Sequence, residues 1–282
     1  MGIFYITMAS VLFGSNPSVQ QVLLLSGMSP DLIALGTIVV GALLAGFTGV
    51  LRHESFRVTG HQMKTLFLAG IIGRGVTEIC LVTAYTMIPA GVATMVHFFF
   101  PTLVSVAMVL LFHEKWTGRT GLAIVLSLAG LLGIAGGTSG SSLQGILVAA
   151  LSSVSFGYYY ILTERSDLKE IPPMVMIFYV HLFAAAANAV MVTARGEWVP
   201  VSGALQGAVL LASGLVGFAG YIFLNAGIPR IGAGIAAFIN MLEPITSVML
   251  SIVLFHSRLE FHTVIGCALI VGAMFVRAGE KR

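Results

Sequence analysis

Two oppositely charged side chains stand four residues apart inside a long apolar segment. Arg74 and Glu78 lie in the segment 64–87, where most other residues are apolar or small. Residues four apart share one face of a helix, so the two side chains can form an ion pair. Charges in such a setting are costly and normally face a cavity or each other. The pair therefore predicts either a site that contacts a charged ligand group or a self-neutralising structural contact.

A third charged residue directly precedes a proline in another apolar segment. Glu243 is followed by Pro244 within the segment 232–255. Proline cannot donate a helical hydrogen bond, so the carbonyl about one turn earlier, near Asn240, is left free. A carboxylate beside freed backbone predicts a group that contacts a ligand or carries a proton. The alternative is a neutral carboxylic acid that is bonded to a neighbouring helix.

Uncharged polar residues follow the same pattern. His97 lies four residues before Pro101, as Asn240 lies four before Pro244. Both side chains can hydrogen-bond a polar ligand, and a histidine can titrate near neutral pH; a lone histidine in an apolar helix can also be a packing group. We predict a substrate-binding set and a gate or cavity wall. The binding set is Asn16, Arg74, Glu78, His97, Tyr158, Asn240 and Glu243, and the wall is Phe98, Phe99, Phe100, Pro101 and Pro244.

A repeat with an offset of 143 residues underlies this placement. Matching residues occur at this spacing throughout the chain. Phe13-Gly14 recurs as Phe156-Gly157, Pro30 as Pro173 and Pro101 as Pro244. Each half holds five apolar segments, an odd number, so the halves must insert with opposite orientation. Inverted repeats with a binding site between them are a common architecture of secondary transporters. The repeat predicts two five-helix domains, 1–138 and 143–282.

Composition places the chain in a membrane. Hydrophobic residues make up 57% of the 282 residues and charged residues 9%, whereas a soluble domain carries about 25% charged residues. Mean hydropathy is +1.00. Crossing a bilayer takes roughly 20 apolar residues. The sequence thus predicts an all-α integral membrane protein with ten transmembrane helices, at 2–25, 30–51, 64–87, 90–112, 119–138, 143–163, 173–194, 203–226, 232–255 and 261–278.

The basic residues predict the orientation of these helices, because cytoplasmic loops carry an excess of Lys and Arg. Loops on one side receive eleven of the fourteen basic residues, the other side receives Arg195 and Arg258, and Arg74 falls inside a span. Both termini are therefore expected in the cytoplasm, and the chain is expected to be a multi-pass protein of the inner or plasma membrane. The eleven are Arg52, Arg57, Lys64, Lys115, Arg119, Arg165, Lys169, Arg230, Arg277, Lys281 and Arg282.

These residues together resemble a known family. The stretches 13–16 (Phe-Gly-Ser-Asn), 156–158 (Phe-Gly-Tyr) and 231–244 are similar to the drug/metabolite transporter superfamily, and within it to the EamA group of ten-helix metabolite exporters. One departure is the second span, where relatives often carry an arginine and this chain reads Leu35-Gly36-Thr37. The resemblance implies alternating access around a central cavity. It also implies movement of small metabolites such as amino acids, often outward.

Other function classes find less support. An intramembrane enzyme needs a nucleophile with a base, or a metal constellation, and the serines of 137–142 have no nearby base in the sequence. A channel usually shows rings of polar groups or a filter signature. We therefore predict a transporter rather than an enzyme, without cofactor, metal or nucleic-acid partner. Its partners would be a small-molecule substrate, the lipid bilayer and, as a candidate coupling ion, the proton; a monomer is favoured.

Overall fold

The computed structural model describes residues 1–282 except 136–141, 200, 256–260 and 280–282. The described residues form helices and no strand. In chain order these are α1 (Gly2–Leu25), α2 (Pro30–Leu51), α3 (Gly60–Leu68), the π-helix η1 (Ala69–Val76), α4 (Thr77–Met87), α5 (Ala90–His97), α6 (Phe100–Phe112), α7 (Gly118–Ala135), α8 (Leu143–Arg165), the 3-10 helix η2 (Asp167–Glu170), α9 (Pro173–Arg195), α10 (Gly203–Ile231), α11 (Ala233–Asn240), α12 (Leu242–Phe255) and α13 (Phe261–Ala278).

Several of these helical segments can cross a bilayer. Within the described part of the chain, seven are long and apolar enough, and they run from 22 to 29 residues. They are Pro30–Leu51, Gly60–Met87, Ala90–Phe112, Leu143–Arg165, Pro173–Arg195, Gly203–Ile231 and Ala233–Leu254. Two shorter apolar helices, Gly118–Gly133 and Phe261–Arg277, accompany them. Each segment predicted to span coincides with a helix or a consecutive set of helices; residues 136–138 of the fifth lie outside the described residues.

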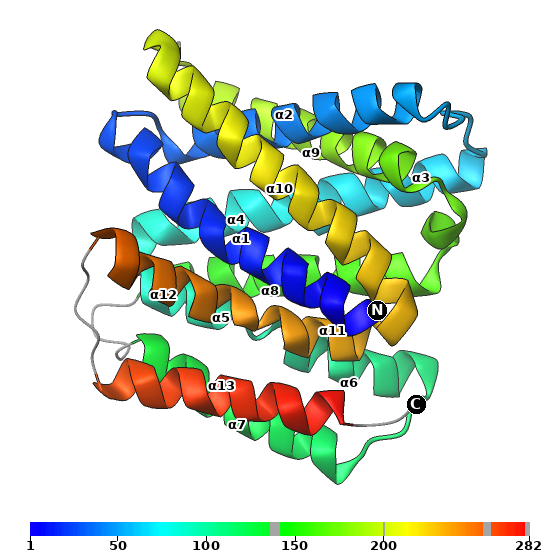
Figure 1. The fold of residues 1–282 in the computed structure, drawn as a ribbon, viewed down its shortest axis with the longest axis vertical. Coiled ribbons are helices and arrows are strands. Elements are labelled where there is room, and N and C mark those ends of the chain that lie inside the picture. Colours follow the sequence, from blue (N-terminus) through cyan, green and yellow to red (C-terminus); the bar gives the residue numbers. More distant parts are fainter. Residues whose placement is uncertain (136–141, 200, 256–260, 280–282) are drawn as a thin grey trace.

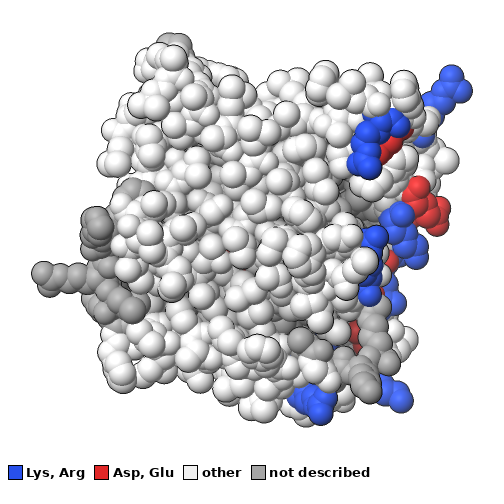
Figure 2. Space-filling model, viewed as in Figure 1, with Lys and Arg blue, Asp and Glu red and all other residues white. Residues whose placement is uncertain are grey.

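The charged side chains gather at one edge of the molecule. Figure 2 shows the Lys, Arg, Asp and Glu atoms at this edge and an uncharged flank beside them, and we call it the charged end. Helix α1 begins and α13 ends there (Figure 1). Large apolar side chains such as Leu43 and Phe47 are 66% and 65% exposed on the flank. Lipid can cover such a surface, whereas water would make it costly. The predicted positions of Arg258, Lys281 and Arg282 lie outside the described residues.

Three predicted spans are not regular helices. The fourth is divided into α5 and α6 at residues 98–99, and the ninth into α11 and α12 at Met241. Each break lies two or three residues before Pro101 or Pro244, because proline removes a backbone donor and crowds the preceding turn. The third span contains the π-helix η1, which has a wider turn than an α-helix. The sequence of η1 is rich in glycine, Ala-Gly-Ile-Ile-Gly-Arg-Gly-Val. Single π-turns inside α-helices are often found at functional sites.

The packing of the helices follows the repeat (Figure 1). Helix α1 packs on α10 and on α11–α12, while α8 packs on η1–α4 and on α5–α6. Under the offset of 143 residues, α1 corresponds to α8, α10 to α3–η1–α4, and α11–α12 to α5–α6, so the two sets of neighbours are equivalent. Two further large interfaces join α2 to α9 and α7 to α13, which are pairs of repeat mates, and α2 also packs on α10 as α9 packs on η1. Every helix of one half thus meets a partner in the other half.

A dense core fills the half of the molecule toward the charged end. Ile6, near the start of α1, Leu224 and Ile228, near the end of α10, and Phe238 of α11 are fully buried. Farther along, the rings of Phe100 and Phe156 lie 4.9 Å apart at their centroids, and Tyr160 packs against both. Among the described residues, this half of the molecule is thus closely packed, as protein interiors are.

Candidate functional site

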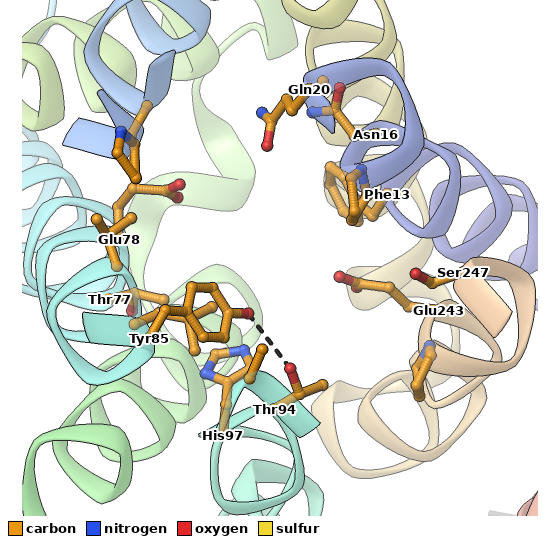
Figure 3. A pocket seen from close by; sticks show the side chains of 18 of the residues that line it. Phe13, Asn16, Gln20, Thr77, Glu78, Tyr85, Thr94, His97, Glu243 and Ser247 are labelled. Atoms are coloured by element: carbon orange, nitrogen blue, oxygen red, sulfur yellow. Dashed lines mark hydrogen bonds between the residues drawn. The ribbon is translucent and has the colours of Figure 1, made fainter. Parts of the chain in front are cut away.

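A cavity of about 610 Å³ lies between α1, α2, η1–α4, α5, α10 and α12. Its volume is within the range of about 300–1,000 Å³ that small-molecule sites occupy. From α1 it takes residues 13–24, from α2 residues 30–37 and from α5 residues 90–98, which are the parts of these helices remote from the charged end. Figure 3 shows polar side chains that enter it from several helices. The cavity therefore extends from mid-depth toward the end opposite the charged end.

Arg74 and Glu78 line this cavity and contact each other through Arg74 Nη1 and Glu78 Oε2. The guanidinium carbon also lies 5.0 Å from the ring centroid of Tyr221 on α10. The side chains are 14% and 22% exposed, so neither is sealed in the core. Arg74 Nε is buried and has no hydrogen-bond partner among the residues that the structure describes. The two interpretations of the sequence thus coexist, since the ion pair is also part of the cavity wall.

Glu243 enters the cavity from α12, opposite Glu78 (Figure 3). It stands in the first turn of the helix that restarts after Met241. Asn240 Nδ2 donates to Glu243 Oε2 at 3.0 Å, and Asn240 Oδ1 lies 3.2 Å from Ser10 Oγ of α1, whose shortest contact is with Ile6 O at 2.7 Å. Asn240 itself is fully buried. It therefore acts through Glu243, by holding the carboxylate toward the cavity.

His97 lies at the corresponding break of the other half and is 6% exposed at the cavity wall. Its Nδ1 is 2.9 Å from Ser152 Oγ of α8, and that hydroxyl donates to Ala149 O at 2.6 Å. Because the Ser152 proton is used in this way, the Nδ1–H of His97 is the donor to Ser152 Oγ. His97 thus has a partner at Nδ1 and also touches the cavity.

The predicted residues divide into those that line the cavity and those that do not. Tyr158 does not, because α8 turns Phe156 to the cavity and Tyr159 and Tyr160 into the core, and at about 100° per residue Tyr158 falls on another face. The lining members of the predicted set are Asn16, Arg74, Glu78, His97, Phe98, Glu243 and Pro244. The others are Tyr158, Asn240, Phe99, Phe100 and Pro101.

The aromatic residues of the predicted wall have three different environments. Phe98 faces the cavity, Phe100 is fully buried in the core, and Phe99 lines a separate apolar groove of about 450 Å³ between α5, α6, α7 and α8. Three consecutive residues at a helix break point in different directions, so only one of them can serve as cavity wall.

The cavity also contains polar residues outside the predicted set. Tyr85 Oη lies 3.3 Å from Thr94 Oγ1 (Figure 3), and Tyr221 stands beside Arg74. The repeat offset could have found Tyr221, because it aligns with Glu78. Thr37, from the stretch that lacks the arginine of relatives, lines the cavity as well. The further polar residues of the lining are Gln20, Gln21, Thr77, His181 and Ser247.

Several helices long and apolar enough to cross a bilayer surround a mainly apolar cavity that charged and polar side chains enter, which is the arrangement of a multi-pass membrane protein with a small-molecule site. The model of the EamA-like transporter family matches residues 1–136 and again residues 143–278, and the chain belongs to this family. It is therefore a member of the drug/metabolite transporter superfamily, as its sequence motifs predict.

Two further similarities accompany the family match. The chain is 26% identical over 229 residues to a "Probable biotin transporter" of Pseudomonas aeruginosa. The aligned region covers 77% of this chain and 78% of the relative. A protein of known crystal structure superposes with a TM-score of 0.80 at 20% identity, over 98% of this chain and 96% of the other. The second likeness is one of fold.

Proposed function

We propose that this protein is a secondary transporter that exports small metabolites, amino acids or related compounds, by alternating access. The observation that carries the proposal is a mainly apolar cavity, entered by charged and polar side chains, with a dense core on one side of it. A channel needs a continuous path, and an enzyme needs a nucleophile with its base or a bound metal. A cavity that is closed toward one end suits a carrier.

The architecture that we propose has ten membrane-spanning helices in two inverted repeats, residues 1–138 and 143–282. The two separate family matches, 1–136 and 143–278, support this division. So does the exchange of neighbours under the repeat offset, in which α1 on α10 corresponds to α8 on η1–α4. We place the charged end, and with it both termini, in the cytoplasm, following the positive-inside rule. The cavity then faces outward.

A polar contact closes the charged end. Glu164 Oε2, from the last turn of α8, accepts a hydrogen bond from Ala233 N, the first residue of α11, at 2.6 Å. The next residue, Arg165, contacts Glu114 in the connection after α6. An anion at a helix N-terminus is favoured by both the free N–H groups and the helix dipole. These contacts tie α8 of the second half to the chain after α6 and to α11 on the cytoplasmic side.

The described residues of the first half that correspond to this contact are not bonded to each other. Gln21 corresponds to Glu164 and Ala90 to Ala233, and both line the cavity. The Gln21 side chain has no hydrogen-bond partner among the described residues. In the inward-facing state, we expect Gln21 to approach the N-terminus of α5 while Glu164 leaves that of α11. The exchange of one contact for the other would be the alternating step.

Uptake into proteoliposomes of the purified protein tests this function. Labelled amino acids, related metabolites and biotin are offered with and without an imposed pH gradient, and protein-free liposomes are the control. Saturable uptake of any of them supports a carrier, and acceleration by the gradient assigns the proton as coupling ion. A rate that rises linearly with concentration, without saturation, would contradict the carrier and favour a channel.

A further inference from the structure

The charges that line the cavity do not balance. Among the lining residues that the structure describes, the ionisable acidic and basic groups other than histidine and tyrosine are Arg74, Glu78 and Glu243. Arg74 is engaged by Glu78 and lies over the Tyr221 ring. Among the described residues, the second carboxylate, that of Glu243, forms a hydrogen bond only with the neutral amide of Asn240. The cavity thus has one carboxylate more than it has guanidinium groups.

The two carboxylates face the same space. Figure 3 shows Glu78 from α4 and Glu243 from α12 pointing toward each other across the cavity. In each carboxylate Oε2 is bonded, to Arg74 Nη1 in one case and to Asn240 Nδ2 in the other. Oε1 of each has no hydrogen-bond partner among the described residues. Two acceptor oxygens therefore remain on opposite sides of one space.

Aromatic side chains surround this space. Tyr85, Phe98, Phe13 and Phe218 are all part of the lining. Aromatic faces attract a cation by about 0.5–2 kcal/mol each, the larger figure where the cation is desolvated. Another described cation at the end opposite the charged end, Arg195, is bound to Asp31 at 2.6 Å and to Thr83 at 2.6 Å. It is committed to the packing of α9 against α2 and α4.

We propose that the cavity recognises a protonated amino group, which sits between Glu78 and Glu243 and is covered by the aromatic side chains. The substrate class is small amines and amino acids with an apolar or aromatic side chain. One carboxylate on the same molecule is accepted, because Arg74 lies one helical turn from Glu78 on the cavity wall. A compound whose only charge is a carboxylate is rejected. The Glu78 and Glu243 carboxylates would then have no ammonium group between them, and the cavity would take up a further anion. This inference rests on the transport function proposed above.

Binding to the purified protein tests the inference with three matched probes. Phenylalanine, phenethylamine and N-acetylphenylalanine share one side chain and differ in their charges. We expect the two amines to bind and the acetylated anion to bind at least about tenfold more weakly, a loss of about 1.4 kcal/mol. Titration calorimetry in detergent measures all three.

Two variants and one control locate the site. Glu78→Gln and Glu243→Gln should each weaken phenethylamine binding at least about tenfold, whereas Glu170→Gln, an exposed carboxylate in η2 outside the cavity, should not. Equal or tighter binding of the acetylated anion overturns the inference, as does unchanged amine binding in both variants or no binding of either amine at millimolar concentration. The wild-type probe series decides the matter alone if a variant does not fold.

Failure of this inference and failure of the transport function give different results. Saturable uptake of a carboxylate such as biotin, without binding of either amine, removes the ammonium site and keeps the carrier. Binding of the amines without uptake of any compound keeps the site and removes the carrier.

Discussion

The segment that carries Arg74 and the helix that carries Tyr221 occupy matching places in the two halves, but their backbones differ. The first is α3–η1–α4, with a π-helix at mid-depth, and the second is α10, which runs unbroken over 29 residues. The offset pairs Arg74 with Gly217 and Glu78 with Tyr221. All four residues line the cavity. A repeated scaffold therefore supplies the positions, and each half fills them with different chemistry.

A similar asymmetry holds at the two helix breaks. Glu243 stands at the break of the ninth span, while its mate Phe100 is buried in the core at the break of the fourth. Each break has a polar residue held by a serine of the opposite half, His97 by Ser152 and Asn240 by Ser10. The supports are alike in both halves, and the carboxylate is present in one. This teaches that the fold can be nearly symmetric while the site is not.

The largest effect is expected from removing the guanidinium group of Arg74. Arg74→Ala leaves Glu78 without its ion partner, so we expect the free energy of unfolding to fall by about 2–3 kcal/mol, somewhat less than for a fully buried pair. Uptake should fall at least about tenfold. Thermal unfolding in detergent and proteoliposome uptake measure the two losses.

The double variant Arg74→Ala, Glu78→Ala is its control. It should recover most of the stability, because no lone charge remains, but not the uptake. A double variant that transports like the wild type would show that the charged pair is structural.

The next effect concerns the backbone of the π-helix. A Cβ at Gly70 would lie 2.6 Å from Phe183 Cβ and 2.8 Å from Val180 O, so Gly70→Ala forces η1 away from α9. We expect a loss of about 1–3 kcal/mol, measured by thermal unfolding.

Helix α10 provides the matched control. Gly207→Ala meets nothing within 4 Å, so it should be neutral or stabilise by up to about 1 kcal/mol. Equal destabilisation by the two substitutions would mean that the close approach at η1 has no special cost.

A third prediction concerns the two ends of the cavity. Glu164→Gln weakens the contact with Ala233 N and should shift the protein toward the inward-facing state by about 1 kcal/mol, the difference between a charged and a neutral acceptor. Thr94→Cys, in a background with Cys80 and Cys267 replaced by alanine, reports the open side. An impermeant maleimide should label it several-fold more slowly in Glu164→Gln.

Gln21→Glu should slow the same labelling, because it strengthens the acceptor of the opposite contact. Lys169→Gln, which changes a charge in η2 away from both contacts, is the control. Faster labelling in Glu164→Gln or in Gln21→Glu would contradict the proposed exchange of contacts.

The smallest effect is expected from the serine supports. Ser152→Ala removes the partner of His97 Nδ1, and Ser10→Ala removes a hydroxyl that contacts Asn240 Oδ1 as well as Ile6 O. Each substitution should cost about 0.5–1.5 kcal/mol of unfolding free energy. Only Ser10→Ala should also affect uptake, because Asn240 holds Glu243. Uptake and thermal unfolding of the pair check this; equal effects on uptake would remove the asymmetry between the breaks.

Much of the fold was predictable, and the site was predictable in part. Helix ends followed local rules, such as Ser29 before Pro30, where the serine oxygen accepts from Leu32 N at 3.3 Å. The helix breaks followed Pro101 and Pro244. The π-helix was not predictable, because a glycine-rich stretch is also compatible with a regular helix in which neighbouring helices approach closely.

By itself, the sequence determined the class of protein. Long apolar segments, few charges, a 143-residue repeat and the basic residues of one side are local or periodic properties, and they need no contact between distant residues. Only the tertiary structure decided which side chains meet in the cavity. The sequence favoured Tyr158 as a binding residue over Tyr221, and this choice was wrong for the cavity, because the rotation of α8 and α10 against their neighbours brought Tyr221 to the cavity and left Tyr158 outside it. That rotation depends on packing between segments far apart in the chain, because in a membrane nearly every face of a helix is apolar and the hydrophobic pattern no longer shows which face points inward.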